Sequence, residues 1–418
     1  MVTIDDENGQ GRGNFVVNEP VDKLGEIIVV RTDATLPLRR KRAESESVDR
    51  RLIDAIVAAL SADADAISEI GFEAQLAAMA DNSKRALCAD LDCFAAWCRD
   101  EQRPILPAEP ETLVLYIRAL DNMDKKPSTM ARRLASLATV QRLIGHSDGL
   151  ALSTNAPMVR AALKAVRRRK GAHQKQAAPL RLGKALDRTV TKGFTLAALL
   201  DACPGDLQGL RDAALLSLGY DAGLRVSELV AVEECHIDPQ EDGSATLFIP
   251  SSKTDQEKIG AWAWLSPETM RRVGAWLQAS GIHDGPIFRR VGVDRRRART
   301  EEGLDGNLSA DMARTTYSIG TASLTRQGVN AIYRRVALSA YDKGLVTLPA
   351  SKVTPALKAL STHSLRVGLT QDLFAAGEDG VGIAQALRWS SPTTALRYGR
   401  KLAVGSNVAA RVLSRVRH

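Results

Sequence analysis

Residues 362–400 read THSLRVGLTQDLFAAGEDGVGIAQALRWSSPTTALRYGR, and their pattern decides the fold of the C-terminal half of the chain. Thr362 is a good N-cap, and apolar residues at helical spacing after it predict a helix that stops at Gly377. A second short helix is predicted over 381–387. Ser391, followed by a proline, predicts the start of a third helix.

Four side chains of this stretch suit the attack of a phenol on a phosphodiester, namely His363, Arg366, Trp389 and Tyr398. His363 and Arg366 are three residues apart, so they share one face of the first predicted helix. A tyrosine can form a covalent ester, and the fork of an arginine matches the geometry of phosphate oxygens. The three helices are therefore predicted to assemble a site for chemistry on a phosphodiester.

Length and charge limit the class of protein. The 418 residues are enough for two or three domains, each with its own core. Lys and Arg exceed Asp and Glu by 57 to 49, and the formal net charge of +8 permits a nucleic-acid partner without requiring one. No signal peptide or bilayer-spanning apolar run is recognisable, so we expect a soluble, cytoplasmic protein with no membrane partner.

The cysteines argue against a metal centre. None of the five, which are Cys88, Cys93, Cys98, Cys203 and Cys235, forms a CxxC pair, so we expect no zinc site and no other metal. Their odd number argues against a disulfide framework. Cys88, Cys93 and Cys98 are interpreted as small buried hydrophobic residues of one helix.

The chain is predicted to be mainly α and to have two folded domains. A helical N-terminal domain is expected over 46–171, and a mixed α/β domain, mostly helical with a small antiparallel sheet, over 193–405. We expect a flexible N-terminal tail over 1–45, an extended linker over 172–192 and a C-terminal segment over 406–418 that contains an amphipathic helix.

Strands are expected at few places. Residues 26–30 form a possible short strand inside the tail, and β-branched and aromatic residues predict strands at 245–249 and 260–265 with a turn between them. The arginine-rich stretch 291–312 is predicted to be a flexible insertion. A basic helix is predicted at 325–341.

Basic residues cluster on two helices of the N-terminal domain. Lys126, Arg132 and Arg133 lie near the start of one helix, and Arg167 and Arg168 lie at the end of another. A solvated helix terminus, favoured by the helix dipole, explains either cluster alone. Two such clusters on one domain of a basic protein favour contacts to phosphates.

Four motifs in order resemble the tyrosine recombinase (phage integrase) family. They are AGLRVSEL at 222–229, SSKTD at 251–255, HSLR at 363–366 and LRWSSPTTALRYGR at 387–400. The resemblance covers roughly residues 45–405. Trp389 stands where most members of the family have His, which is similar to one subgroup of the family. Any single motif is weak, and the signal lies in their order and spacing.

The resemblance implies how the scissile phosphate is held. Arg225 and Arg366 grip it and stabilise its transition state, and Glu228 steadies the site by hydrogen bonding. Trp389 donates its indole N–H to a non-bridging oxygen. An indole cannot shuttle protons as a histidine can, so position 389 is expected to act by hydrogen bonding and packing alone.

The resemblance also implies the roles of the reacting groups. Tyr398 forms a 3′-phosphotyrosyl link. Lys253, on a mobile turn between two strands, protonates the departing 5′-oxygen, and His363 accepts the tyrosine proton or positions the phosphate. No cofactor is implied, because the ester keeps the energy of the broken bond.

The implied partners are DNA and further copies of the chain. The two domains are expected to form a C-shaped clamp on double-stranded DNA, where Arg326 contacts a guanine in the major groove and Lys126, Arg132 and Arg133 hold the other face. The C-terminal helix docks into a neighbouring protomer. This implies a homotetramer on two inverted-repeat sites, which exchanges strands through a Holliday junction.

Ordinary structural roles explain each feature taken singly. Arg225 and Glu228 could be a surface ion pair, Trp389 a core aromatic residue, and Lys253 a solvated turn residue. Two functional alternatives also remain: a DNA-binding protein of this fold that no longer cuts, and a relaxing enzyme similar to type IB topoisomerases.

Overall fold

The computed structural model describes residues 26–34, 47–60, 69–144, 152–171, 176–183, 193–251, 259–296, 299–302, 308–311, 313–399, 412–413 and 416. The chain forms two compact units. The helical unit is Leu38–Lys175, and the larger unit combines Met1–Pro37 with Gln176–His418. Each unit has its own buried apolar core, as expected for independently folded domains.

The helical unit consists of α-helices, as predicted for this part of the chain. They are α1 (Val48–Val57), α2 (Glu69–Ala77), α3 (Asp81–Asp100), α4 (Pro110–Asn122), α5 (Pro127–Leu143) and α6 (Pro157–Lys170). Prolines open α4, α5 and α6, where the missing N–H costs nothing. An aromatic cluster joins α3 to α4, with the rings of Phe94 and Tyr116 5.0 Å apart. Cys88 and Cys98 are buried as predicted, whereas Cys93 is exposed.

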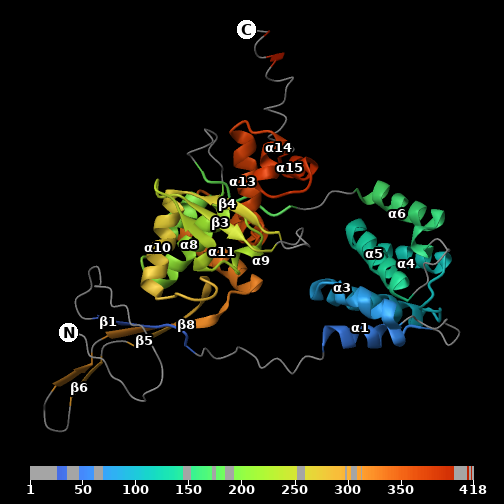
Figure 1. Cartoon of the computed structure of the whole chain (residues 1–418), viewed down its shortest axis with the longest axis horizontal. Helices are drawn as coiled ribbons and strands as arrows, with labels where there is room; N and C mark the ends of the chain where they lie inside the picture. Colours follow the sequence, from blue (N-terminus) through green and yellow to red (C-terminus); the bar gives the residue numbers. More distant parts are fainter. Residues whose placement is uncertain are drawn as a thin grey trace. The chain divides into compact units, whose positions relative to one another are not determined.

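The larger unit is mostly helical with small sheets (Figure 1), which confirms the predicted fold class. Its helices are α7 (Leu196–Ala202), α8 (Leu207–Asp221), α9 (Val226–Leu229), α10 (Pro267–Ser280), α11 (Arg326–Asp342), α12 (Ala350–Ala359), α13 (Ser364–Ala375), α14 (Gly380–Ala386) and α15 (Pro392–Gly399). The side chains of Thr195, Ser266 and Thr325 cap α7, α10 and α11. Helix α12 has no counterpart among the predicted elements.

One antiparallel sheet lies in the order β2-β3-β4, from β2 (Ile237–Pro239), β3 (Ala245–Ile249) and β4 (Ala261–Leu265). The last two strands are those predicted from sequence. Ala245, Leu247 and Ile249 point into the core, whereas Trp262 and Trp264 on the opposite face are 60% and 57% exposed. The sheet thus has one buried face and one exposed face.

A second sheet lies in the order β1-β8-β5, from β1 (Glu26–Arg31), β8 (Ala313–Ser323) and β5 (Arg289–Arg296). Strands β6 (Arg299–Glu302) and β7 (Leu308–Asp311) form a separate pair. The prediction that 291–312 is a flexible insertion is therefore wrong for the residues in β5, β6 and β7. Val291 and Val293 pair with Ile319 and Tyr317, so a strand period is present although arginines dominate the sequence.

The predicted tail over 1–45 is wrong for residues 26–34, because β1 pairs in parallel with β8 over its whole length. Three further bonds fix its C-terminal end. Asp33 accepts from Arg289 Nη1 at 2.6 Å, Thr32 Oγ1 donates to Ser280 O at 2.5 Å, and Ala34 N donates to Ile319 O at 2.8 Å. The strand suggested at 26–30 is confirmed.

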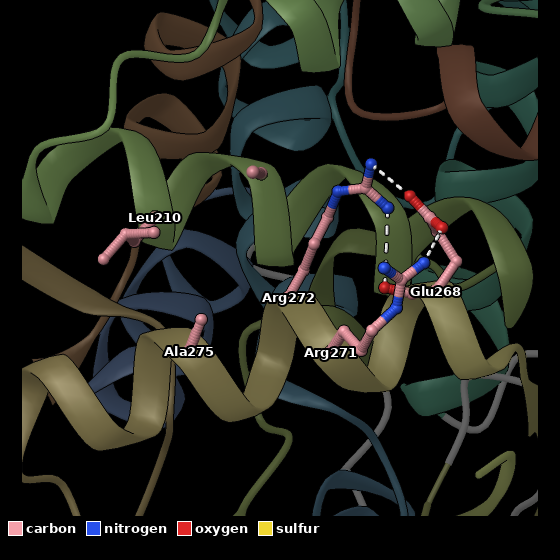
Figure 2. Close-up of a pocket in the computed structure, with 6 residues that line it drawn as sticks. Leu210, Glu268, Arg271, Arg272 and Ala275 are labelled. Atoms are coloured by element: carbon pink, nitrogen blue, oxygen red, sulfur yellow. Dashed lines mark hydrogen bonds and ion pairs between the residues drawn. The ribbon is translucent and has the colours of Figure 1, made fainter.

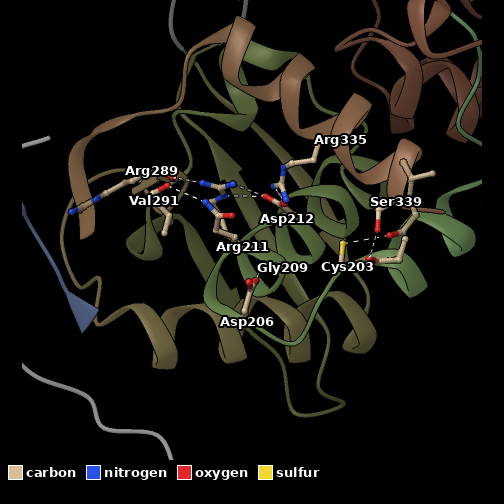
Figure 3. A network of polar contacts seen from close by, with 12 residues as sticks. Cys203, Asp206, Gly209, Arg211, Asp212, Arg289, Val291, Arg335 and Ser339 are labelled. Carbon is tan, nitrogen blue, oxygen red and sulfur yellow. Dashed lines mark hydrogen bonds and ion pairs between the residues drawn. The ribbon is translucent and has the colours of Figure 1, made fainter. Parts of the chain in front are cut away.

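A buried polar network ties β5 to two helices of the same unit (Figure 3). Asp212 on α8 is fully buried and is paired with Arg211 at 2.7 Å and with Arg335 on α11. Arg211 Nη1 also donates to Arg289 O at 3.3 Å. Such a carboxylate needs partners, because an unpaired buried charge is strongly destabilising.

Residues 176–183 of the predicted linker are extended and belong to the larger unit. Leu180 is fully buried, its N–H donates to Ser364 O at 2.9 Å, and Arg181 Nε binds Asp372 at 2.5 Å. The backbone of Leu180 passes so close to α13 that a Cβ on Gly368 would lie 1.9 Å from Leu180 O. Residues 176–183 are therefore part of the packing of α13.

No helix in the described part of the chain is long and apolar enough to cross a membrane.

Removing β1 tests its contribution to the larger unit. Deleting residues 1–34 should lower the free energy of unfolding by about 2 kcal/mol or more, because the edge of β8 loses its hydrogen bonds and buried Arg289 loses Asp33. Deleting only residues 1–24 keeps β1 and should leave the melting temperature unchanged. Equal melting temperatures for both truncations would contradict the role of β1.

The contact between Leu180 and α13 can be tested with a matched pair of glycine substitutions. Gly368→Ala should destabilise the protein by about 2 kcal/mol or more, since the new Cβ meets rigid backbone. Gly274→Ala on α10 meets nothing within 4 Å and should stabilise the protein by about 0.5–1 kcal/mol. Chemical denaturation of both variants measures the difference in sign.

Candidate active site

The loop before α9 brings Arg225 to the site. Gly223 has a φ of +53°, and a Cβ there would lie 2.3 Å from Leu387 Cδ2, so only glycine lets the loop pack against Leu387. Arg225 follows as the N-cap residue of α9. The first motif is thereby held against the segment after α14, about 160 residues later in the chain.

Glu228 holds Arg225 at two points. Its Oε2 accepts from the backbone N of Arg225 at 2.9 Å, and its Oε1 binds Arg225 Nη1 at 2.7 Å. The Glu228 side chain is 1% exposed and that of Arg225 is 17% exposed. This is a buried, hydrogen-bonded pair and not the solvated surface pair that spacing alone allows.

Arg366, on α13, joins the two halves of the site. Its Nη1 donates to Gly223 O at 2.6 Å, and its Nη2 donates to Leu387 O. The residue is 4% exposed. Burial lowers the pKa of its guanidinium, and the neighbouring charge of Arg225 lowers it further. An anionic ligand would relieve both effects, so the site is electrostatically suited to a phosphate.

Trp389 and Tyr398 complete the cluster. Their rings are stacked with centroids 5.4 Å apart and planes 12° apart, and the guanidinium of Arg366 lies 5.0 Å from the centre of the Trp389 ring. Gly399 lets α15 approach α13, because a Cβ there would lie 2.1 Å from the ring of Phe374. The structure thus brings together Arg225, Arg366, Trp389 and Tyr398.

Burial distinguishes Tyr398 from most of the other tyrosines. Tyr116, Tyr220, Tyr317 and Tyr333 are buried, and burial together with Asp372 raises the pKa of Tyr220, which donates to that carboxylate. Tyr398 is half-buried beside the arginines. Of these five residues it is the one that is both partly exposed and next to Arg366.

His363 lies at the edge of the cluster. It is exposed and is itself the N-cap residue of α13, one turn before Arg366. The prediction that Thr362 is the N-cap is wrong. Thr362 is buried, and Ser364 Oγ instead accepts from Ser361 N at 2.9 Å, which closes the turn that precedes the helix.

Lys253 lies outside the described residues. The flanking strands β3 and β4 are antiparallel, and Ile249 at the end of β3 pairs with Ala261 at the start of β4. The assignment of Lys253 to a turn between two strands stays a prediction.

The basic residues of α5 differ in their surroundings. Arg133 is 16% exposed on its side chain, donates to Tyr116 Oη at 2.9 Å and lies 3.8 Å from buried Asp90. Arg132 is half-exposed and also pairs with Asp90, which Ser136 contacts at 2.7 Å. Arg133 therefore serves the packing of the helical unit, and Arg132 is partly neutralised.

Other predicted DNA-contacting residues are exposed. Lys126 is the N-cap residue of α5, Arg167 and Arg168 lie in the last turn of α6, and Arg326 is the first residue of α11. Their neighbours Arg169 and Lys170 differ, because both pair with Asp121. The exposed side chains of Lys126, Arg167, Arg168 and Arg326 are therefore available to bind an anionic partner.

Two supports of the site were not found from sequence. Asp372 on α13 accepts from Tyr220, from Arg181 and, at 2.7 Å, from Leu182 N, so it anchors α13 to α8 and to the segment 176–183. Arg388 lies against Glu228. A charged residue directly after a predicted helix C-terminus, where glycine is usual, was the available signal.

Two other features lie outside this cluster. A hollow between α8 and α10 is lined by Leu210, Ala213, Glu268, Arg271, Arg272 and Ala275, and its charges are paired with one another (Figure 2). Glu233, Cys235 and His236 could offer metal-ligating atoms within 4.8 Å of one another. His236 Nδ1, however, accepts from Glu233 N at 3.2 Å, which places the proton on Nε2 and opposes binding of a metal there.

Comparison with known proteins identifies two sequence relatives. An integrase/recombinase XerD homologue of Selenomonas ruminantium is 36% identical over 220 residues, which cover 51% of this chain and 60% of that protein. Recombinase Cre of Escherichia phage P1 is 25% identical over 344 residues, which cover 80% of this chain and 89% of Cre. No protein-family model matches the chain.

The fold has relatives among solved structures. The site-specific recombinase XerH, in a post-cleavage complex with a palindromic difH substrate, has a TM-score of 0.51 at 12% identity, covering 86% of this chain and 94% of XerH. The XerD homologue is matched over less than two thirds of its length, and Cre over most of its own. In sequence the chain is similar to these integrases and recombinases, and three of its four motifs, at 222–229, 363–366 and 387–400, meet in one cluster of the structure.

Proposed function

We propose that this protein is a site-specific DNA recombinase that cuts and rejoins duplex DNA through a 3′-phosphotyrosyl intermediate. One observation carries the proposal. Arg366 binds the loop before Arg225 and the segment before Trp389, whose ring stacks on Tyr398. Groups from three separate parts of the chain therefore converge where one backbone phosphate can bind.

The two arginines supply the electrostatic part of the catalysis. Negative charge grows on the non-bridging oxygens as the phenol attacks, and guanidinium groups already in place stabilise it without reorganisation. Arg225 and Arg366 outnumber the single carboxylate Glu228, so the site carries net positive charge before DNA binds. Trp389 adds an indole N–H donor to the cluster.

The reacting groups have separate roles. Tyr398 Oη attacks phosphorus, its proton passes to His363, and the bond to the 5′-oxygen breaks as Lys253 protonates the leaving group. The 3′-phosphotyrosyl ester keeps the energy of the original bond. The 5′-hydroxyl of a partner strand then attacks the ester and releases Tyr398, and two such exchanges pass through a Holliday junction.

Exposed cations of both units hold the duplex in this proposal. Arg326, at the N-terminal end of α11, is suited to a guanine in the major groove. Lys126, Arg167 and Arg168 contact phosphates from the helical unit. Arg133 is left out of this set, because its guanidinium is engaged with Tyr116 and Asp90.

The C-terminal segment is proposed to link protomers into a cyclic tetramer on two inverted-repeat sites. Val412, Leu413 and Val416 are 50%, 47% and 74% exposed, and their spacing places them along one side of a helix. An apolar helical face of this kind gains free energy by docking on another protomer, and a head-to-tail contact that closes gives a ring.

Substituting the nucleophile tests the chemistry. On a nicked duplex that carries a binding site selected from random sequence, the wild-type protein should accumulate a covalent protein–DNA adduct. Tyr398→Phe should abolish the adduct, because no oxygen remains to form the ester, and should change the affinity for DNA by less than about threefold. Denaturing gels and a binding titration measure the two effects.

The same assay separates the alternatives. A catalytically silent DNA-binding protein gives no adduct with the wild-type chain, and an adduct at another side chain contradicts the assignment of Tyr398. A relaxing enzyme changes the linking number of a plasmid without joining ends from two duplexes. Recombinant products from two sites are therefore expected, with Tyr398→Phe as the inactive control.

Salt dependence tests the phosphate contacts of α6. Changing both Arg167 and Arg168 to Ala should reduce the slope of log affinity against log salt concentration by about 1–2, since each lost phosphate contact contributes about 0.9. Arg85→Ala, in the same unit but paired with Asn82 and Asp81, is the control and should leave the slope unchanged. Equal slopes for all three proteins would remove α6 from the interface.

A further inference from the structure

Arg388 occupies a backbone position that normally suits glycine. It is the first residue beyond the C-cap of α14, and its φ is +56°, in the left-handed region. The hydrogen bonds are those of a helix end closed by such a residue: Arg388 N donates to Gln385 O at 3.1 Å and Trp389 N donates to Ala384 O at 2.8 Å. A residue with a Cβ is strained there, so something other than the turn must account for the arginine.

The side chain of Arg388 reaches the support of Arg225. It is 10% exposed, its Nη2 donates to Ala222 O at 2.9 Å, and the same nitrogen lies 3.7 Å from Glu228 Oε2. That carboxylate oxygen is the one that accepts from Arg225 N. Arg388 therefore contacts both the loop that precedes Arg225 and the carboxylate that orients it.

The position of Arg388 is costly in another way. Its Nε is buried without a hydrogen-bond partner among the described residues, and its pKa is lowered by burial, against which Glu228 acts. Glycine at this position would make the folded protein more stable, because it removes both the strained Cβ and the buried charge. The cost points to a role in the site.

We propose that Arg388 is a positioning residue for DNA cleavage, which acts through Glu228 and Ala222 to hold the Arg225 guanidinium toward the scissile phosphate. With Arg388 present, Glu228 is held from two sides and the carbonyl of Ala222 is fixed. Without Arg388, the Glu228 side chain can rotate, and the Arg225 side chain that is hydrogen-bonded to it moves as well. Arg366 is held independently, through Gly223 and Leu387.

The inference rests on the proposed function, because it concerns the rate of the same cleavage step. It does not extend to binding of DNA as such. Arg388 is buried under the loop, so its loss should change how the bound phosphate reacts and leave the affinity for the duplex nearly unchanged.

Substitution by glycine and alanine separates positioning from stability. Arg388→Gly and Arg388→Ala both remove the guanidinium, but only glycine relieves the strained backbone. In a single turnover, both variants should form the covalent adduct with a nicked duplex about tenfold more slowly than the wild type, with unchanged affinity for DNA. Arg388→Gly should have a higher melting temperature than Arg388→Ala. Arg388→Lys, which keeps the charge, should recover most of the rate.

The second arm tests whether the effect passes through Glu228. In a Glu228→Gln background, adding Arg388→Gly should cost less than about twofold, because the partner of Arg388 is already altered. In a Ser47→Ala background, which removes the N-cap of α1 in the helical unit, adding Arg388→Gly should cost the full factor. Independent, multiplicative losses with Glu228→Gln would overturn the proposed route.

The outcomes also distinguish this inference from the proposed function. If the wild-type chain forms no adduct, the proposed function fails and Arg388 has no cleavage to position. If the wild-type chain forms the adduct and Arg388→Gly matches its rate, the inference alone fails. A loss of rate that follows the melting temperature across the Gly, Ala and Lys variants would assign Arg388 to stability and overturn the positioning role.

Discussion

The arrangement of the site depends on the two hydrogen bonds that buried Arg366 donates to main-chain carbonyls. One acceptor, Gly223, precedes the residue at the N-cap of α9, and the other, Leu387, follows α14. A buried guanidinium needs hydrogen-bond acceptors, because its charge has lost its hydration. The fold supplies them as these two carbonyl groups. The same bonds fix the distance between the first and last motifs, so the hydrogen bonds of one buried cation also align Arg225 with Trp389 and Tyr398.

Helix α13 can present Arg366 because its other buried positions are equally constrained. Asp372 is held by Tyr220, Arg181 and the N–H of Leu182, and Gly368 admits the backbone of Leu180 against the helix. The segment 176–183 thus acts as a brace along α13. Its sequence is typical of a linker, yet its packing against α13 helps to position Arg366.

Local patterns in the sequence revealed much of this. Ser391 followed by Pro392 and the three-residue spacing of Arg225 and Glu228 follow from short-range geometry, so the start of α15 and the ion pair could be predicted. The same reasoning placed the N-cap of α13 one residue too early, at Thr362. Charge clusters were less informative. Arg133 and Arg167 look alike in sequence, but only the structure shows that Asp90 on another helix draws Arg133 inward. Pairings between distant parts of the chain leave no local signal, and for this reason the pairing of the strand at 26–31 with β8 and the contact of Arg388 with Glu228 were not predicted.

The parallel pairing of β1 with β8 has a consequence for biosynthesis. Residues 26–31 are made almost 290 residues before their partners at 313–318. At about 5–20 residues per second, the nascent strand stays unpaired for roughly 15–60 s. The helical unit can fold in that interval, because its helices are close together in the sequence. The larger unit cannot be completed until β8 has been made and can pair with β1. A newly made chain therefore exposes the run EIIVVR until β8 has been made, and chaperones that bind short apolar segments can bind β1 during that interval.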